Sequence, residues 1–111
     1  MKTVQSLATI LVLFMSTSLY AAYNSDISGV VTDVVVSTGS DYIYFKLNNQ
    51  PVTHPQCNPE YFAISSTLSA DRRRVLLSRA MLSQATERPM SVGYDNLGSC
   101  SGGYIRIYKL G

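Results

Sequence analysis

The feature that most constrains the fold is a single segment whose apolar residues recur with the period of a helix. It is flanked by segments in which apolar and polar residues alternate, as in strands. Ser69 can act as the helix N-cap and Asp71 places a carboxylate in the first turn, where the helix dipole favours it. Pro89 cannot continue a helix, so the spacing predicts one helix from Ala70 to about Thr86. Its broad apolar face, expected to pack on a sheet, comprises Leu76, Leu77, Ala80, Met81 and Ala85.

Five segments are rich in β-branched and aromatic residues and are predicted to be strands. They are residues 27–36, 42–47, 60–65, 90–94 and 104–110. The first two flank turn-forming residues and are expected to form a hairpin, in which Gly29 marks a bulge or a close backbone approach. A mostly β chain with one helix after its third strand predicts an OB-fold-like, five-stranded antiparallel barrel. An open α+β sheet is the alternative.

The chain begins like a secretory signal peptide, with Lys2, an apolar stretch over residues 7–15, and small residues at Ala21 and Ala22. We therefore expect residues 1–22 to be cleaved, residues 23–111 to form a single domain, and the protein to be secreted or periplasmic. The apolar stretch is too short to be a good transmembrane helix, so no membrane span is expected in the mature form.

A domain of this size buries only about 60–65% of its unfolded surface, which leaves its core marginal. Small domains usually add a disulfide, a metal or an oligomer. Cys57 and Cys100 are the only cysteines, and after export they predict one disulfide closing a loop of about 43 residues. The single histidine, His54, lies among prolines and is interpreted as a loop residue. With no paired ligand spacing, no metal site is expected.

Charge and motifs exclude several classes of function. Removing Lys2 lowers the formal net charge of +2 by one, which is no signature of a nucleic-acid-binding protein. The sequence lacks the nucleophile elbow, the zinc-protease motif and the P-loop. Because no acid–base pair stands in a recognisable spacing, we expect no enzymatic activity and no cofactor.

The predicted helix carries a second apolar stripe, made by Val75 and Leu82 on the side away from its broad apolar face. The stripe has two interpretations: either the helix is sunk deep in its own domain, or its second face packs on a neighbouring subunit. The basic run from Arg72 to Arg74 is interpreted as a solvated face.

Three short motifs follow one another in the predicted domain. They are Ser28-Gly-Val-Val31, Tyr44-Phe45, and the helix with Leu76, Ala80 and Leu82 leading into Pro89-Met-Ser-Val-Gly-Tyr94. The order and spacing of these motifs over residues 28–94 resemble those in the B subunits of bacterial toxins that combine one A subunit with five B subunits. The resemblance is to the B subunits of the subtilase cytotoxin and typhoid toxin type. One departure is Lys46, which stands where the family has a half-cystine.

The resemblance implies a receptor-binding lectin that forms a homopentamer, binds sialylated glycans or glycoproteins, and carries a catalytic A subunit. By position, Ser28 and Tyr94 would contact the sugar, with Asn24 as a weaker third contact in place of an acidic residue. The pore-lining helix would present Val75, Leu82, Arg72 and Arg79 to the subunit interface. The alternative is a small periplasmic or secreted binding or inhibitor domain of the same fold with no toxin partner.

Overall fold

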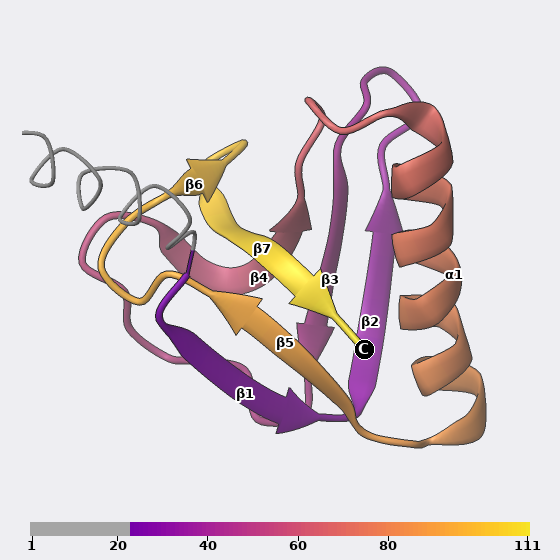
Figure 1. Cartoon of the computed structure of the whole chain (residues 1–111), viewed down its shortest axis with the longest axis horizontal. Coiled ribbons are helices and arrows are strands. Elements are labelled where there is room, and N and C mark those ends of the chain that lie inside the picture. The colour runs from indigo at the N-terminus through magenta and orange to yellow at the C-terminus, as the bar shows by residue number, and fades with distance from the viewer. Residues whose placement is uncertain (1–22) are drawn as a thin grey trace, which may run out of the picture.

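A computed structural model describes residues 23–111 of the chain, so the predicted signal peptide and its cleavage site lie outside the described residues. The elements are β1 (Ser25–Gly29), β2 (Val31–Val36), β3 (Ile43–Leu47), β4 (Asn58–Ile64), α1 (Ala70–Thr86), β5 (Met90–Tyr94), β6 (Cys100–Ser101) and β7 (Tyr104–Leu110). Figure 1 shows one curled sheet with α1 standing along its β2 side.

The strand order in the sheet is β1-β5-β7-β4-β3-β2, with β6 paired to β7. The sheet curls into a half-barrel that is compatible with an OB-like fold, and this confirms the predicted class of a mostly β chain with one helix. The sheet is mixed rather than wholly antiparallel, because β7 runs parallel to β4. β4 and β5 lie on either side of β7 and run in opposite directions, so β7 is antiparallel to β5 and parallel to β4.

The predicted first strand is divided into β1 and β2, which occupy opposite ends of the strand order. Two asparagines from the loop after β3 bind the backbone at the point where β1 ends and β2 begins. Asn48 Oδ1 accepts a hydrogen bond from the Val30 amide at 3.1 Å, and Asn49 Nδ2 donates to the Ser28 carbonyl at 2.8 Å. A Cβ at Gly29 would lie 2.0 Å from Asn49 Oδ1, so Gly29 marks the close approach that the sequence predicted.

The helix has the predicted bounds. The Ser69 hydroxyl accepts a hydrogen bond from the Arg72 amide at 3.2 Å, and the C-cap residue Glu87, just after the last helical residue, has the left-handed conformation. Leu76, Leu77 and Ala80 pack toward the sheet, as predicted. Met81 and Ala85 are exposed, so their assignment to the packing face was wrong. The face of α1 that packs on the sheet therefore holds fewer apolar residues than the pattern suggested, because the polar Ser83 occupies part of this buried face.

Ser83 is fully buried and fixes the helix to the rest of the fold. Its hydroxyl accepts from the Val31 amide at 3.0 Å and donates to the Arg88 carbonyl at 2.6 Å. One hydroxyl therefore satisfies a buried donor at the start of β2 and an acceptor just after the helix, where unpaired groups would be costly. This contact joins α1 to the point where the first strand divides.

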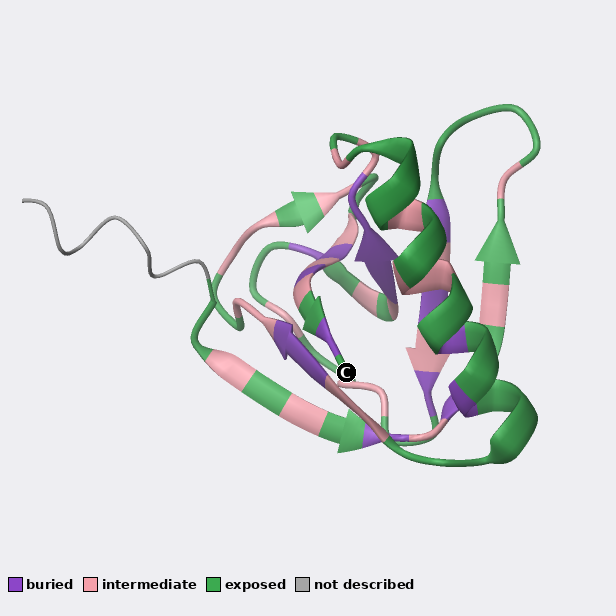
Figure 2. Cartoon of the chain, turned by 45° about the vertical axis from the view of Figure 1, so that its right-hand side comes forward, coloured by how far each residue is buried: buried purple, intermediate pink, exposed green. Residues whose placement is uncertain are grey.

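The core fills the space between the curled sheet and α1 (Figure 2). Its largest fully buried side chains are Phe45, Phe62, Leu47, Ile64, Ile105, Val31 and Val92. The ring of Phe62 lies between those of Phe45 and Tyr94, with centroids 5.7 and 5.2 Å away. The predicted disulfide is present and links Cys57, just before β4, to Cys100 in β6.

Candidate glycan-binding surface

The two residues assigned to the sugar site by resemblance lie on opposite faces of the β1–β5 ladder. Ser28 is exposed and pairs with Ser91, whereas Tyr94 pairs with Ser25, three positions along the ladder. Because successive side chains of a strand alternate between faces, this odd separation places them on different sides. Tyr94 is half-buried against the Phe62 ring. The structure therefore does not bring Ser28 and Tyr94 together.

Asn24, the third residue of the predicted site, does lie beside Tyr94. The backbone amide of Asn24 donates a hydrogen bond to the backbone carbonyl of Tyr94 at 3.2 Å. Its side-chain oxygen accepts from the Asn96 amide at 3.0 Å, and Nδ2 donates to Asp95 Oδ1 at 3.3 Å. The side chain of Asn24 thus holds the turn after β5 through both of its polar atoms.

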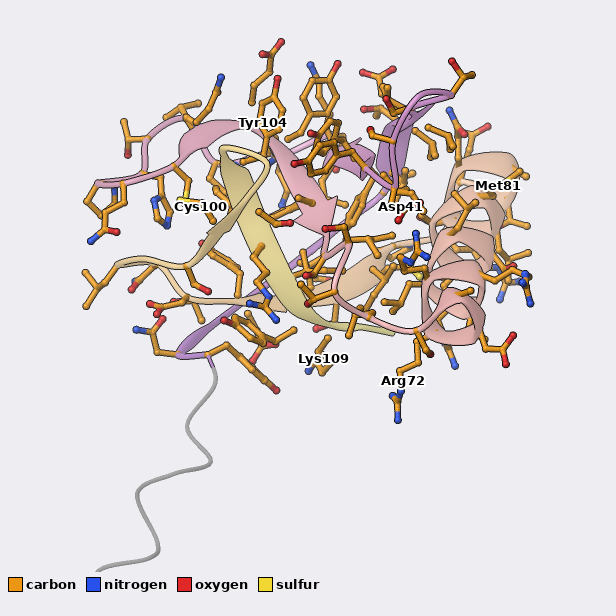
Figure 3. The ribbon with its side chains drawn as sticks, turned by 90° about the horizontal axis from the view of Figure 1, so that it is seen from above. Asp41, Arg72, Met81, Cys100, Tyr104 and Lys109 are labelled. Carbon is orange, nitrogen blue, oxygen red and sulfur yellow. A yellow bond between two sulfur atoms is a disulfide. The ribbon has the colours of Figure 1, made fainter. Side chains whose placement is uncertain are left out.

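A different set of side chains gathers on the outer face of β3, β4 and β7. This tyrosine cluster consists of Tyr42, Tyr44, Tyr61 and Tyr104. Tyr44 lies at its centre, with ring centroids 5.9 Å from Tyr42, 6.2 Å from Tyr61 and 4.5 Å from Tyr104. Figure 3 shows Tyr104 at the upper side of the domain, away from the sheet interior.

Two features bring the tyrosines of the cluster together: side chains alternate between the two faces of each strand, and β4 pairs with β7, which is distant in sequence. In β3, Phe45 is buried, while Tyr44 on the other face is half-buried. The parallel pairing of β4 with β7 then brings Tyr61 and Tyr104 together, with ring centroids 5.4 Å apart. At Gly102, where φ is +59°, a Cβ would lie 2.6 Å from the Tyr44 hydroxyl, so glycine lets the turn before β7 pass close to the cluster.

The cluster presents aromatic faces, hydroxyls and one cation. Burial, and then the neighbouring Tyr42 and Tyr104, raise the pKa of Tyr44 above its ordinary value of 10.0, so this hydroxyl stays protonated at neutral pH. Lys46 lies beside the cluster, with Nζ 5.4 Å from the Tyr61 ring centroid and 3.8 Å from Asp33 Oδ2. Tyr42, at the edge, is 37% exposed.

This chemistry suits a sugar. Tyrosine offers an apolar ring against which a sugar can pack and a hydroxyl that both donates and accepts hydrogen bonds. The corresponding face of OB folds binds oligosaccharides and oligonucleotides. Lys46 is a cation beside the cluster, and its Nζ is also 3.8 Å from Asp33 Oδ2.

The outward face of α1 is the second surface of interest. Val75 is 56% exposed and Leu82 57% exposed, so the interpretation of a helix sunk deep in its own domain is excluded for this chain. Arg72 and Arg79 are exposed on the same helix. In Figure 2 the side of the helix turned away from the sheet is almost continuously exposed. The stripe predicted from the sequence is therefore an unpartnered apolar surface of the single chain.

Comparison of the chain with protein-family profiles, curated proteins and solved structures finds no match in any of the three. Within residues 23–111, no helix is long and apolar enough to cross a membrane. The same residues hold no group of three or more histidine, cysteine, aspartate or glutamate side chains arranged to bind a metal ion.

Proposed function

We propose that the protein is a secreted glycan-binding subunit, the receptor-binding B subunit of a multimeric toxin, which recognises sialylated host glycans as a homopentamer. The observation that carries the binding role is the tyrosine cluster on the outer face of an OB-like sheet. The resemblance to toxin B subunits supplies the sialylated ligand, the ring and the catalytic A subunit. Lys46 beside the cluster gives a carboxylate-bearing sugar a cation to approach.

Oligomerisation would compensate for a weak site. The cluster is an open surface rather than a deep cavity, and surface sites of this kind gain strength when several copies bind together. The exposed stripe of Val75 and Leu82 offers apolar area for packing between subunits. A ring that buries it would also support a domain whose own core is small.

The second candidate is a small secreted or periplasmic binding domain without a toxin partner. One observation favours it: Lys46 stands where the toxin family has a half-cystine, and the disulfide joins Cys57 to Cys100 instead. The two candidates share the binding surface and differ in oligomeric state. Light scattering of the purified protein at micromolar concentration separates them, since the first requires pentamers and the second monomers.

Replacing Tyr42 by alanine is expected to weaken glycan binding about tenfold, because one aromatic face is lost from the edge of the cluster. A glycan array identifies the bound sialoside, and titration calorimetry then measures the affinity of each variant. Tyr23→Ala is the matched control, since Tyr23 is 36% exposed and packs on Tyr108 outside the cluster.

Ser28→Ala distinguishes the two locations for the site. If Ser28→Ala weakens binding and Tyr42→Ala does not, the sugar binds on β1 and the cluster has another role. If no sialoside is bound by the unmodified protein, the lectin proposal is rejected.

Replacing Leu82 by glutamate is expected to convert pentamers to monomers, because an unpaired charge would be buried at the interface. The far-ultraviolet circular dichroism spectrum should not change, since Leu82 is 57% exposed within the chain. Multi-angle light scattering measures the mass. Val52→Glu is the control, because Val52 is an 87% exposed apolar residue in the loop between β3 and β4. A Leu82→Glu protein that stays pentameric would show that this stripe is not the interface.

A further inference from the structure

An apolar pocket of about 390 Å³ lies between the first two turns of α1 and β7. Its walls are formed by Leu68, Val75, Leu76 and Ile107, with Ser65, Asp71, Arg72, Arg106 and Tyr108 completing the lining. This volume is within the range of pockets that hold small organic ligands. None of its residues belongs to the tyrosine cluster, but Arg72 and Val75 also lie on the helix surface that the pentamer would use. In Figure 3, Arg72 and Tyr104 point to opposite sides of the domain.

The pocket arises where two paired strands separate. The last residue pair between β4 and β7 is Ala63 with Arg106. Beyond it, β7 keeps β5 on its other edge from Ile107 onward, but its β4 edge is left unpaired, because the chain after β4 turns toward the start of α1. The residues just past the separation, Ser65 and Tyr108, face the resulting gap from its two sides. The cavity is thus a consequence of the sheet topology rather than of one poorly packed side chain.

Two arginines give this apolar pocket a positive charge. Within the described residues, neither Arg72 nor Arg106 is in a salt bridge, whereas Asp71 is neutralised by Arg74 at 2.8 Å. Arg106 Nε is buried and has no hydrogen-bond partner in the described part of the chain. The Arg106 guanidinium lies 5.0 Å from the Tyr108 ring centroid, which restricts its position. Because the Nε atom itself is covered, a ligand in the pocket would pair with the terminal Nη groups of the guanidinium.

We propose that this pocket binds a small amphipathic carboxylate, such as a medium-chain fatty acid. The carboxylate accepts hydrogen bonds from Arg106 and is approached by Arg72 from the first turn of the helix. The apolar body packs on Leu68, Leu76 and Ile107. Arginine is the side chain best suited to a carboxylate, because its planar guanidinium can donate two parallel hydrogen bonds. A neutral ligand of the same shape, such as an alcohol, can still accept a hydrogen bond, but it carries no negative charge to pair with the guanidinium.

Titration calorimetry of the purified, disulfide-bonded protein with octanoate tests the proposal. Octanoate should bind saturably, while octan-1-ol and octyltrimethylammonium should bind at least tenfold more weakly. Amide chemical shifts of Ser65 and Ile107 should move on titration with octanoate. Arg106→Gln is expected to lower octanoate affinity at least tenfold, and Arg72→Gln about threefold.

A second pocket variant and a control variant outside the pocket complete the experiment. Arg72 is exposed, so Arg72→Gln tests the charge requirement even if Arg106→Gln fails to fold. Arg88→Gln is the control, since Arg88 is exposed beyond the far end of α1 and does not line the pocket. Absence of saturable octanoate binding overturns the proposal, as does octan-1-ol binding of equal strength. Shift changes confined to other residues, or equal loss in Arg88→Gln, also overturn it.

Discussion

Phe62→Ala is expected to lower the free energy of unfolding by about 3–5 kcal/mol, the range measured when a buried aromatic ring is deleted. Phe62 is fully buried in the middle of β4, where its ring contacts those of Phe45 and Tyr94. Strands on both sides of β4 pair with Phe62 itself, through Phe45 in β3 and Ile105 in β7. The neighbours are therefore held by the sheet and cannot move far into the cavity that alanine would leave.

Urea unfolding followed by circular dichroism measures this effect. Phe62→Leu keeps most of the volume and should cost roughly 1–2 kcal/mol. Val52→Ala should change stability by less than about 0.5 kcal/mol, because Val52 is 87% exposed. Small domains have total stabilities of roughly 5–15 kcal/mol, so Phe62→Ala should be partly unfolded at 37 °C if the total lies at the lower end of that range. A loss below about 1 kcal/mol would mean that Phe62 is not the centre of the core.

Removing the disulfide is expected to destabilise the protein by about 3–4 kcal/mol, which is the chain-entropy estimate for a loop of this length. Cys57 and Cys100 are 43 residues apart, and the loop that they close contains α1 and β5. In the oxidised unfolded chain this loop remains closed, so less entropy is lost on folding. Cys57 is also buried, and its replacement removes a small part of the core.

Urea unfolding with and without a thiol-free reductant gives the measurement. The double variant Cys57→Ala, Cys100→Ala is the control, because reductant should not change its stability. Each titration is repeated at several protein concentrations, since an oligomer's apparent stability rises with concentration and a monomer's does not. Equal unfolding midpoints for the oxidised and reduced protein would contradict the expectation.

The sequence was sufficient for elements whose signals are local. Ser69 and Pro89 bracket α1, and both act through the backbone of their immediate neighbours, so the predicted start at Ala70 and the predicted end at about Thr86 agree with the structure. The disulfide followed from there being only Cys57 and Cys100 to pair. Alternation in β3 correctly divided buried Phe45 from the outward-facing Tyr44.

The remaining features depend on contacts between distant parts of the chain. The division of the first strand needs the Asn48 and Asn49 side chains, which belong to a different loop. The tyrosine cluster needs β4 beside β7, a parallel pairing that no local pattern specifies. Alternation could have shown Tyr42 and Tyr44 on one face of β3, but their meeting with Tyr61 and Tyr104 required the sheet order.

The glycan site that the resemblance implies also depends on the register of distant strands. Ser28 and Tyr94 were assigned by position along the sequence, and a one-residue difference in ladder register moves a side chain to the other face. The structure pairs Ser28 with Ser91 instead, and leaves Tyr94 packed on Phe62. Asn24 lies at the same end of the ladder as Tyr94, so two of the three assigned residues are neighbours.

The pairing of β1 with β5 also fixes when the domain can fold during synthesis. Ser25 is among the first described residues to leave the ribosome, yet its partner Tyr94 is made 69 residues later. Strand pairs this far apart in sequence form slowly, because a long segment must be ordered first. Met90–Tyr94 and Tyr104–Leu110 must both be available before β1 has a place in the sheet. β1 can therefore join the sheet only after almost the whole domain has emerged.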